Sequence, residues 1–470
     1  MKKALRCIAF LIVMFLVIRT TYDVLSWKDT AEKYVSSTKQ LYATDDNLMD
    51  VVFLGSSHCY CGIAPDVLWG NYGMAAFNMA TSGQDKFSTY HLLKEVLKTQ
   101  SPKVVCVEMW GLTFDEHAVQ GNVYRNMLAM RLSQNSISLV REYVDEGAQL
   151  DYILRWPIIH TRYKELDKYD FLQNDINAYG RAVPMSYRIG YGYASPEAIE
   201  CNEIGELTDT NEEWIENLYQ LSLDKDFQLV FFVTPTTLTI ENQMQVNAVK
   251  AFAQENGIDF FDFNKAISEV GVDYSKDFLD ASHLNGYGAE KITDYIGEYI
   301  LENYPVDDHR GEEEYWQWEK SYAYYEQIKN AYELENATSA EEFVKKLKTM
   351  NDVTYVVSLE GTYDESTLNM KEIAGMIGIQ DEDYKTGGTF LYSNGELKHI
   401  MDNSSMEVYI HEINQYDSFK IQNMSLVNPN ATNLDDIVLN MKSVGTVYNG
   451  LSIVVYDNLR KMLISQKGYY

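Results

Sequence analysis

The stretch Val51-Val52-Phe53-Leu54-Gly55-Ser56-Ser57-His58 predicts the fold of the first half of the chain. Four apolar residues without alternation are typical of a short parallel strand that is covered on both faces. Gly55 lets the backbone turn tightly where this strand ends. We therefore expect a serine at the carboxyl edge of a sheet, where open α/β folds place their ligands. Taken alone, the stretch is equally compatible with an ordinary strand-to-helix turn that carries two capping serines.

Four further apolar segments read as strands of the same sheet, and helical patterns separate them. This alternation predicts an α/β fold, a doubly wound and flavodoxin-like parallel sheet, over residues 48–306. A long insertion at about 112–215 includes the aromatic and glycine-rich stretch 187–193. It is either a lid or sugar platform at the sheet edge, or a surface excursion packed on its own aromatics. The further strands are expected near Phe77 and at 103–109, 228–234 and 258–263.

The amino-terminal segment carries basic residues, then an apolar run from Cys7 to Ile18, which Arg19 closes. This run of about 12 residues spans ~18 Å as a helix, against ~30 Å of membrane hydrocarbon, and by itself fits a signal peptide. A helix that continues to Trp27 spans the membrane if Arg19 snorkels to the interface. Because no small-residue cleavage site follows, we expect residues 1–27 to be an uncleaved signal-anchor rather than a cleaved signal peptide. The bulk of the chain is then extracytoplasmic, at the cell surface, or secreted if the leader is cleaved, and residues 28–47 form a stem.

The composition of the 470 residues sets limits on the class of protein. With 46% hydrophobic and 23% charged residues, the chain has ample material for a core, and its length predicts two domains. The formal net charge of −30 argues against a nucleic-acid partner, because phosphate backbones would repel the chain. Cys59 and Cys61 are too close for a usual zinc half-site, so we expect neither a metal nor another cofactor. The five cysteines leave the redox compartment open.

The character of the chain changes after Val306. Residues 307–350 read as a charged and aromatic helical linker. Residues 351–470 read as a β-rich domain, with strands at 353–359, 388–392, 407–413 and 450–456 separated by turn pairs such as Asn394-Gly395.

The chemistry of an acyl-transfer serine needs a base and a carboxylate that orients the base. Asp280-x-x-His283 can supply both from one turn, and it follows the last predicted strand. We therefore predict Ser57 as the nucleophile, His283 as the base and Asp280 as its orienting carboxylate. The alternative is an ordinary surface Asp–His pair. His58 is either a hydrogen-bond donor in the pocket or a residue at the helix start that faces away.

Together, these segments resemble the SGNH (GDSL-like) hydrolase family over about residues 48–304. Gly55-Ser56-Ser57 stands where the family has Gly-Asp-Ser, residues 78–83 resemble its second block, and Asp280 and His283 match its last block. The resemblance implies that the backbone N–H groups of Ser57 and Gly83 bind the oxyanion.

One block departs from the family pattern. Glu108-Met109-Trp110-Gly111 replaces the family's Gly-x-Asn-Asp, whose asparagine normally completes the oxyanion hole. Losing such a donor costs about 3 kcal/mol of transition-state stabilisation. Asn78 or Asn285 could substitute, the backbone N–H groups could suffice, or the site is degenerate. Glu108 itself is expected to be a structural hydrogen-bond acceptor.

The Gly-Ser-Ser-His form with a signal-anchor is similar to the membrane-tethered branch of the family, which includes DltD, AlgJ and AlgX. This resemblance implies an extracytoplasmic serine acyltransferase or esterase that acts on O-acyl groups, chiefly acetyl, of a cell-surface polysaccharide. Its partner in that branch is often a membrane-bound O-acyltransferase. The alternative is a catalytically degenerate SGNH-fold protein that binds glycan or serves as a scaffold in a cell-envelope assembly. Residues 450–457 faintly resemble a carbohydrate-binding type of β domain, which is compatible with both.

Overall fold

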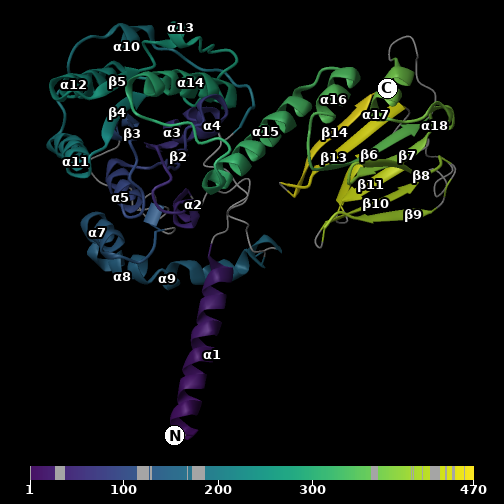
Figure 1. Ribbon diagram of the computed structural model, residues 1–470, viewed down its shortest axis with the longest axis horizontal. Coiled ribbons are helices and arrows are strands. Elements are labelled where there is room, and N and C mark those ends of the chain that lie inside the picture. Colours follow the sequence, from purple (N-terminus) through teal and green to yellow (C-terminus); the bar gives the residue numbers. More distant parts are fainter. Residues whose placement is uncertain are drawn as a thin grey trace. The chain divides into compact units, whose positions relative to one another are not determined.

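The computed structural model describes most of the 470 residues and divides them into two compact units, residues 1–325 and 326–470 (Figure 1). Each unit is described by itself below. The described residues are 2–26, 37–113, 126–127, 130–166, 168–171, 186–360, 369–403, 405, 407–414, 417–423, 435–439, 442–446, 450–459 and 461–469.

The first unit is built on a five-stranded sheet in which every pairing is parallel. The strand order is β2-β1-β3-β4-β5, the order of flavodoxin-like doubly wound folds. The predicted parallel α/β sheet is thereby confirmed. Its strands are β1 (Val51–Leu54), β2 (Ala76–Asn78), β3 (Val104–Glu108), β4 (Gln228–Val233) and β5 (Asp259–Asp262).

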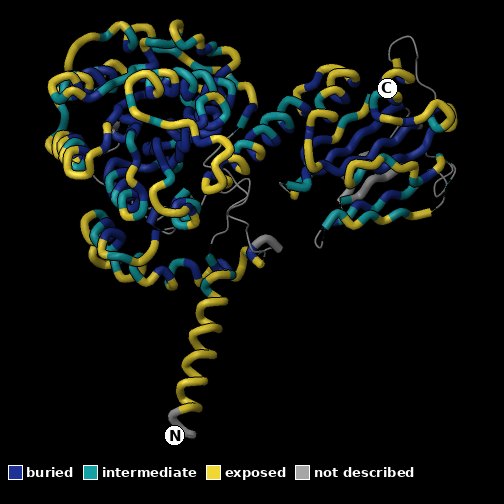
Figure 2. The backbone as a smooth tube through the Cα atoms, viewed as in Figure 1, coloured by how far each residue is buried: buried dark blue, intermediate teal, exposed yellow. Residues whose placement is uncertain are grey.

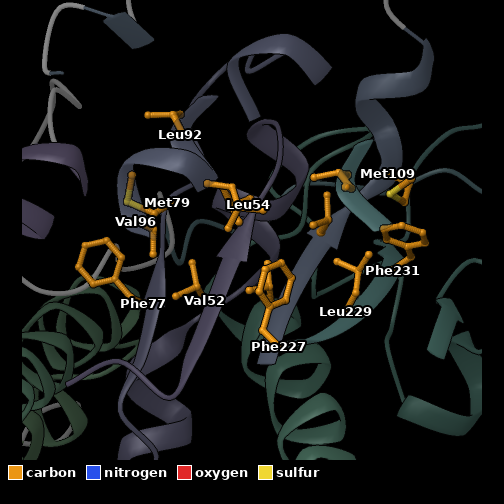
Figure 3. Packing of buried hydrophobic residues seen from close by; sticks show 14 of the residues in the cluster. Val52, Leu54, Phe77, Met79, Leu92, Val96, Met109, Phe227, Leu229 and Phe231 are labelled. Atoms are coloured by element: carbon orange, nitrogen blue, oxygen red, sulfur yellow. The ribbon is translucent and has the colours of Figure 1, made fainter. Parts of the chain in front are cut away.

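Successive residues of each strand enter opposite layers of the core, as the pleat of a strand requires. Val52 and Leu54 pack with Phe77 and Phe231 in the layer shown in Figure 3. Val51 and Phe53 of the same strand pack in the layer on the other face. A strand that is buried on both faces has no polar side to present, which explains the unbroken apolar run at residues 51–54.

Helices cover both faces of this sheet. One layer receives apolar side chains from α5 (Lys86–Val96), α7 (Gln134–Tyr143), α11 (Asp209–Lys225) and α12 (Ile240–Asn256). The other layer receives them from α3 (Ser57–Gly62), α4 (Pro65–Tyr72) and α14 (Gly286–Asn303). Shorter helices of this unit are α2 (Ser37–Ala43), η1 (Met109–Thr113), α13 (Ile267–Val270) and η5 (Glu313–Tyr315).

The amino-terminal helix α1 (Lys2–Leu25) is exposed along almost its whole length (Figure 2). Its segment Leu5–Leu25 is long and apolar enough to cross a membrane, which is compatible with a signal-anchor or with a signal peptide. Trp27 and residues 28–36 of the predicted stem lie outside the described residues, and α2 lies in the rest of the stem.

The predicted insertion at 112–215 is described in part, since residues 114–125, 128–129, 167 and 172–185 lie outside the described residues. Its remaining elements, besides α7 and the first part of α11, are α8 (Glu146–Leu154), α9 (Trp156–Ile159), η2 (His160–Lys164), η3 (Lys168–Phe171) and α10 (Pro196–Glu200).

The predicted linker, residues 307–350, contains the helices α15 (Trp316–Asn336) and α16 (Ala340–Leu347). The Trp318 indole donates a hydrogen bond of 2.9 Å to the Ala76 carbonyl inside the core of the first unit. Phe343 of α16 belongs to the core of the second unit. The two halves of this segment therefore serve as core elements of different units.

The second unit consists of two antiparallel sheets and short helices. The sheet order is β14-β13-β6-β7-β8 in one and β12-β11-β10-β9 in the other. The predicted β-rich character is confirmed. The predicted turn at Asn394-Gly395 joins β7 to β8, and both of its residues have positive φ angles, 52° and 82°. The elements are α17 (Met370–Ile377), α18 (Asp381–Thr386), β6 (Val353–Glu360), β7 (Gly388–Ser393), β8 (Glu396–Met401), β9 (Val408–Glu412), β10 (Ser418–Asn423), β11 (Asp435–Leu439), β12 (Lys442–Thr446), β13 (Gly450–Asp457) and β14 (Met462–Tyr469).

Candidate active site

The turn after β1 exposes Ser57 at the carboxyl edge of the parallel sheet. Gly55 has a φ of 151°, and a Cβ added there would lie 2.5 Å from Cβ of Glu108, so the turn requires glycine. Ser56 caps α3, because its Oγ accepts a hydrogen bond of 3.2 Å from the His58 amide. Ser57 follows as the first residue of α3 and remains partly exposed.

Ser57, His283 and Asp280 lie in contact although 226 residues separate the serine from the histidine. Ser57 Oγ is 2.9 Å from His283 Nε2. His283 Nδ1 is 3.0 and 3.1 Å from the two carboxylate oxygens of Asp280. This is the sequence of contacts that a nucleophile, a base and an orienting carboxylate need. The structure thus brings the three predicted residues together, and their catalytic roles remain predictions.

The loop that carries Asp280 and His283 lies between β5 and α14, and backbone hydrogen bonds within the loop close it. Leu279 N–H donates to the His283 carbonyl at 2.8 Å, and Asn285 N–H donates to the Asp277 carbonyl at 2.9 Å. Within this loop, Asp280 Oδ1 accepts hydrogen bonds of 2.9 Å from the amides of Ser282 and His283. Backbone hydrogen bonds therefore fix the position of the Asp280 carboxylate beside the His283 imidazole.

Asp280 is held in its ionised form. Partial burial acts to raise its pKa, but the Ser282 amide, the charge of His283 and the His283 amide outweigh burial, so the pKa is lowered. An ionised carboxylate at Nδ1 keeps the proton on that nitrogen and leaves Nε2 free to accept the Ser57 proton.

The His58 ring faces the site, so of the two alternatives for this residue the one in which it faces away does not hold. It stacks on the His283 ring with centroids 4.7 Å apart, and its centroid lies 4.6 Å from that of the Trp110 ring. Burial, followed by repulsion from the charge of His283, lowers the pKa of His58 to about 3. His58 is therefore neutral at ordinary pH, and its Nδ1 has no hydrogen-bond partner among the described residues.

Glu108 braces the nucleophile turn from the end of β3, as expected for a structural acceptor. It accepts hydrogen bonds from the Ser56 hydroxyl at 3.0 Å and from the Trp110 amide at 2.6 Å. Burial raises the pKa of Glu108 to about 7, although these donors favour the carboxylate. The contact explains why serine is suitable at position 56, where the resembled family has aspartate: two carboxyl groups would face each other here.

The two candidate side-chain donors for an oxyanion are engaged elsewhere. The Asn78 amide nitrogen lies 3.3 and 3.4 Å from the carbonyls of Cys59 and Ile63, under α3. The Asn285 amide nitrogen donates to backbone carbonyls, the shortest contact being 2.7 Å to Lys276, while its oxygen caps α14. Both side chains are therefore structural.

The backbone donors predicted for the oxyanion remain available. Among the described residues, no hydrogen-bond acceptor is found for the N–H groups of Ser57 and Gly83. Gly83 has a positive φ of 67° in the turn that follows β2. That turn begins beside the nucleophile turn, because Thr81 N–H donates to the Gly55 carbonyl at 3.3 Å.

The stretch 187–193 braces the Asp280 loop, an arrangement that the sequence did not reveal. Gly190 N–H donates to the Phe278 carbonyl at 2.6 Å, and a Cβ at this position would lie 2.1 Å from the Leu279 carbonyl oxygen. Tyr187 is fully buried, and its hydroxyl donates to Glu290 of α14 at 2.8 Å. Close packing thus explains Gly190 and Tyr187, whereas Tyr191 and Tyr193 are 80% and 58% exposed.

In the part of the chain that the structure describes, no group of three or more histidine, cysteine, aspartate or glutamate side chains could hold a metal ion. The groups gathered around Ser57 are a neutral imidazole, an indole, a carboxylate-oriented imidazole and backbone N–H donors. Together they can activate a hydroxyl for attack on an acyl carbonyl.

No protein-family model and no curated protein matches the chain. Among solved structures, it is similar to a candidate acylhydrolase from Bacteroides fragilis, with 14% identity and a TM-score of 0.28, covering 59% of this chain and 99% of that one. It is also similar to a candidate GDSL-like lipase from Parabacteroides merdae, with 13% identity and a TM-score of 0.27, covering 54% and 96%. Similarity at these TM-scores carries no argument, so the function is inferred from the geometry of the site.

Proposed function

We propose that this protein is a serine-dependent acyl-ester hydrolase or O-acyltransferase. The observation that carries the proposal is the chain of contacts from Ser57 Oγ to His283 Nε2 and from His283 Nδ1 to Asp280. A hydroxyl is a weak nucleophile at its ordinary pKa, and a neighbouring base that a carboxylate orients is the usual means of activating it.

In the proposed reaction, Ser57 Oγ attacks the ester carbonyl while His283 Nε2 takes the hydroxyl proton. The tetrahedral oxyanion accepts hydrogen bonds from the N–H groups of Ser57 and Gly83. Its collapse breaks the ester C–O bond, and His283 returns the proton to the leaving alcohol. Water or an acceptor hydroxyl then attacks the acyl-Ser57 ester, with His283 acting first as base and then as acid.

We further propose that the substrate carries O-acyl groups, chiefly acetyl, on a cell-surface polysaccharide. This part of the proposal is supported by the resemblance to the branch that includes DltD, AlgJ and AlgX, together with the apolar helix α1, which can anchor the chain. The same resemblance suggests a membrane-bound O-acyltransferase as partner, with the bulk of this chain outside the cytoplasm.

The test replaces the nucleophile. We expect Ser57→Ala to abolish turnover of p-nitrophenyl acetate, because no other hydroxyl lies against Nε2 of His283 among the described residues. The matched control is Ser282→Ala, which removes a hydroxyl 3.4 Å from His283 Nδ1. It should retain most of the activity. Activity that survives Ser57→Ala, with an unchanged circular dichroism spectrum, would remove Ser57 from the mechanism.

A second candidate function is a degenerate site in a glycan-binding or scaffold protein. It is favoured by one observation, the engagement of both Asn78 and Asn285 with backbone carbonyls, which leaves the oxyanion without a side-chain donor. A fluorophosphonate probe distinguishes the two, since it labels only an activated serine. Labelling of the wild type, with none of Ser57→Ala, supports the enzyme. Absence of labelling, with glycan retained by both, supports the scaffold.

A further inference from the structure

The carboxyl end of α1 is tied to the folded body of the first unit by an arginine. Arg162 of η2 donates hydrogen bonds of 2.9 Å to the Leu25 carbonyl and 2.8 Å to the Ser26 carbonyl. The last carbonyls of a helix lack partners within the helix, and a guanidinium there also favours the helix dipole. Arg162 is buried and is paired at 2.7 Å with Asp170, so its position is set by the body.

A stacked aromatic pair makes the second tie. The rings of Tyr22 and Trp156 are parallel within 23°, with centroids 6.3 Å apart. Tyr22 lies 17 residues after Leu5, where the apolar span begins, and this separation is ~26 Å along a helix. If Leu5 is at one face of a ~30 Å hydrocarbon layer, Tyr22 and Trp156 lie close to the other face. Tyrosine and tryptophan are the residues enriched at that depth.

The elements that make these ties also expose large apolar side chains. We name residues 146–163, which include α8 and α9, the collar; Figure 1 shows α9 beside the end of α1, with α8 next to α9. Leu150 and Leu154 lie one turn apart on α8, and their side chains are 63% and 57% exposed. Tyr163 and Trp156 are exposed next to them along the chain. Trp156 is partly covered by the Tyr22 ring, whereas Leu150, Leu154 and Tyr163 are each more than half exposed.

We propose that the collar rests in the interfacial layer of the bilayer that α1 crosses. The occupant of the apolar face is thus lipid, because α9, which joins α8 along the chain, contacts the end of a membrane-length helix. The net charge of −30 also favours membrane binding through apolar insertion, since an acidic chain is not attracted to anionic lipid headgroups. The proposal rests on the membrane anchor but not on the esterase chemistry.

The test measures the depth of labels on the full chain in phosphatidylcholine vesicles. Leu150→Cys and Leu154→Cys, each in a Cys7→Ser/Cys201→Ser background, are coupled to an environment-sensitive NBD fluorophore. The matched control is Leu223→Cys on α11, which is 58% exposed in the same unit. We expect the collar labels to be quenched by a lipid nitroxide near the headgroup and shielded from aqueous iodide, and the control label to show the reverse.

The outcomes separate the anchor from the collar. The chain could float with the vesicles while iodide quenches the collar labels as strongly as the control label. That result would contradict the placement of the collar in the interfacial layer but would leave the membrane anchor intact. A chain that does not float would overturn both. Turnover of p-nitrophenyl acetate in the same vesicles reports the esterase independently, so its loss would not be mistaken for a failure of the collar.

Discussion

At the scale of single residues, the site depends on which nitrogen of each imidazole holds a proton. His283 must carry its proton on Nδ1, facing Asp280, if Nε2 is to accept one from Ser57. Its neighbour His58 is neutral at ordinary pH, so it adds no positive charge against the imidazolium that forms during the reaction. Asp280 thus favours a proton on Nδ1 of His283, and the neutral His58 ring does not repel the positive charge that His283 gains when it takes the Ser57 proton.

Replacing the carboxylate by its amide should disturb that state. We expect Asp280→Asn to lower kcat for p-nitrophenyl acetate by about 10²–10⁴-fold, because the amide can donate to Nδ1 and so favours the wrong tautomer. The matched control is Asp273→Asn, since Asp273 also accepts from a serine amide two residues later, at 2.8 Å, but touches no histidine. Equal activity of the two variants would show that Asp280 does not orient the base.

Two buried groups give opposite pH dependences of stability. His58 binds a proton at pH 6.5 in its ordinary state but only near pH 3 when folded, so it destabilises the fold as the pH falls below 6.5. Glu108 keeps its proton up to about pH 7 when folded, against 4.5 ordinarily, so the stability it contributes is lost as the pH rises through 7. Each slope is about 1.4 kcal/mol per pH unit, and between pH 4.5 and 6.5 they nearly cancel.

The variant Glu108→Gln should therefore reveal the slope that His58 imposes. Relative to the wild type, we expect its free energy of unfolding to rise by about 1.4 kcal/mol per unit between pH 4.5 and 6.5. Urea titrations followed by tryptophan fluorescence measure this, since all 7 tryptophans lie before residue 326 and report only the first unit. Adding His58→Asn should remove this difference, and a Glu108→Gln profile parallel to that of the wild type would contradict the assignment.

At the scale of elements, the Asp280 loop is held between α14 and the stretch 187–193. The approach at Gly190 is so close that any Cβ would meet the Leu279 carbonyl, one residue before Asp280. The precision of the Asp–His pair is thus set in part by a segment that carries none of the predicted catalytic residues.

This packing predicts an effect of substitution at a distance from the chemistry. We expect Gly190→Ala to displace the loop and lower kcat by about 10²-fold, the loss associated with misplacing a catalytic group by ~1 Å. The matched control is Gly375→Ala in α17, where no atom lies within 4 Å of the added Cβ. Unchanged kcat in Gly190→Ala would show that the loop position does not depend on the brace.

The elements could be predicted where the chain has a single strong periodicity. The apolar runs at residues 51–54 and 228–233 are buried on both faces, so no other pattern competes with the strand. The strand β8 was not predicted, because Glu396-Leu397-Lys398-His399 mixes charged residues into a mostly exposed strand. The helix α17 was also missed, although Met370, Ile373, Ala374 and Ile377 are buried at helical spacing.

Some contacts around Ser57, His283 and Asp280 could also be predicted from the sequence, and others could not. Asp280 and His283 could be predicted because their spacing is local and the carboxyl ends of parallel strands meet at one edge. The contact of Glu108 with Ser56 could not, since it joins side chains 52 residues apart and depends on the register of β1 with β3. The orientation of His58 likewise depends on Trp110 and His283, which only the folded chain brings together.

At the scale of the whole molecule, all residues of the candidate site belong to one of the two units. The site lies within residues 1–325, and the second unit consists of antiparallel sheets whose predicted binding of carbohydrate stays a prediction. The length of the chain predicted two domains, but not that α15 begins within one core and ends in the other unit. Such sharing depends on tertiary packing around Trp318, for which the sequence gives no local signal.

The sequence separation of 226 residues also means that Ser57 is synthesised well before His283. A ribosome that adds 5–20 residues per second needs roughly 10 to 45 s to travel that distance. Throughout this interval, the hydroxyl exists without the imidazole that must activate it. If Ser57 is the nucleophile, it therefore stays unactivated until β5, the Asp280 loop and α14 have been made and folded.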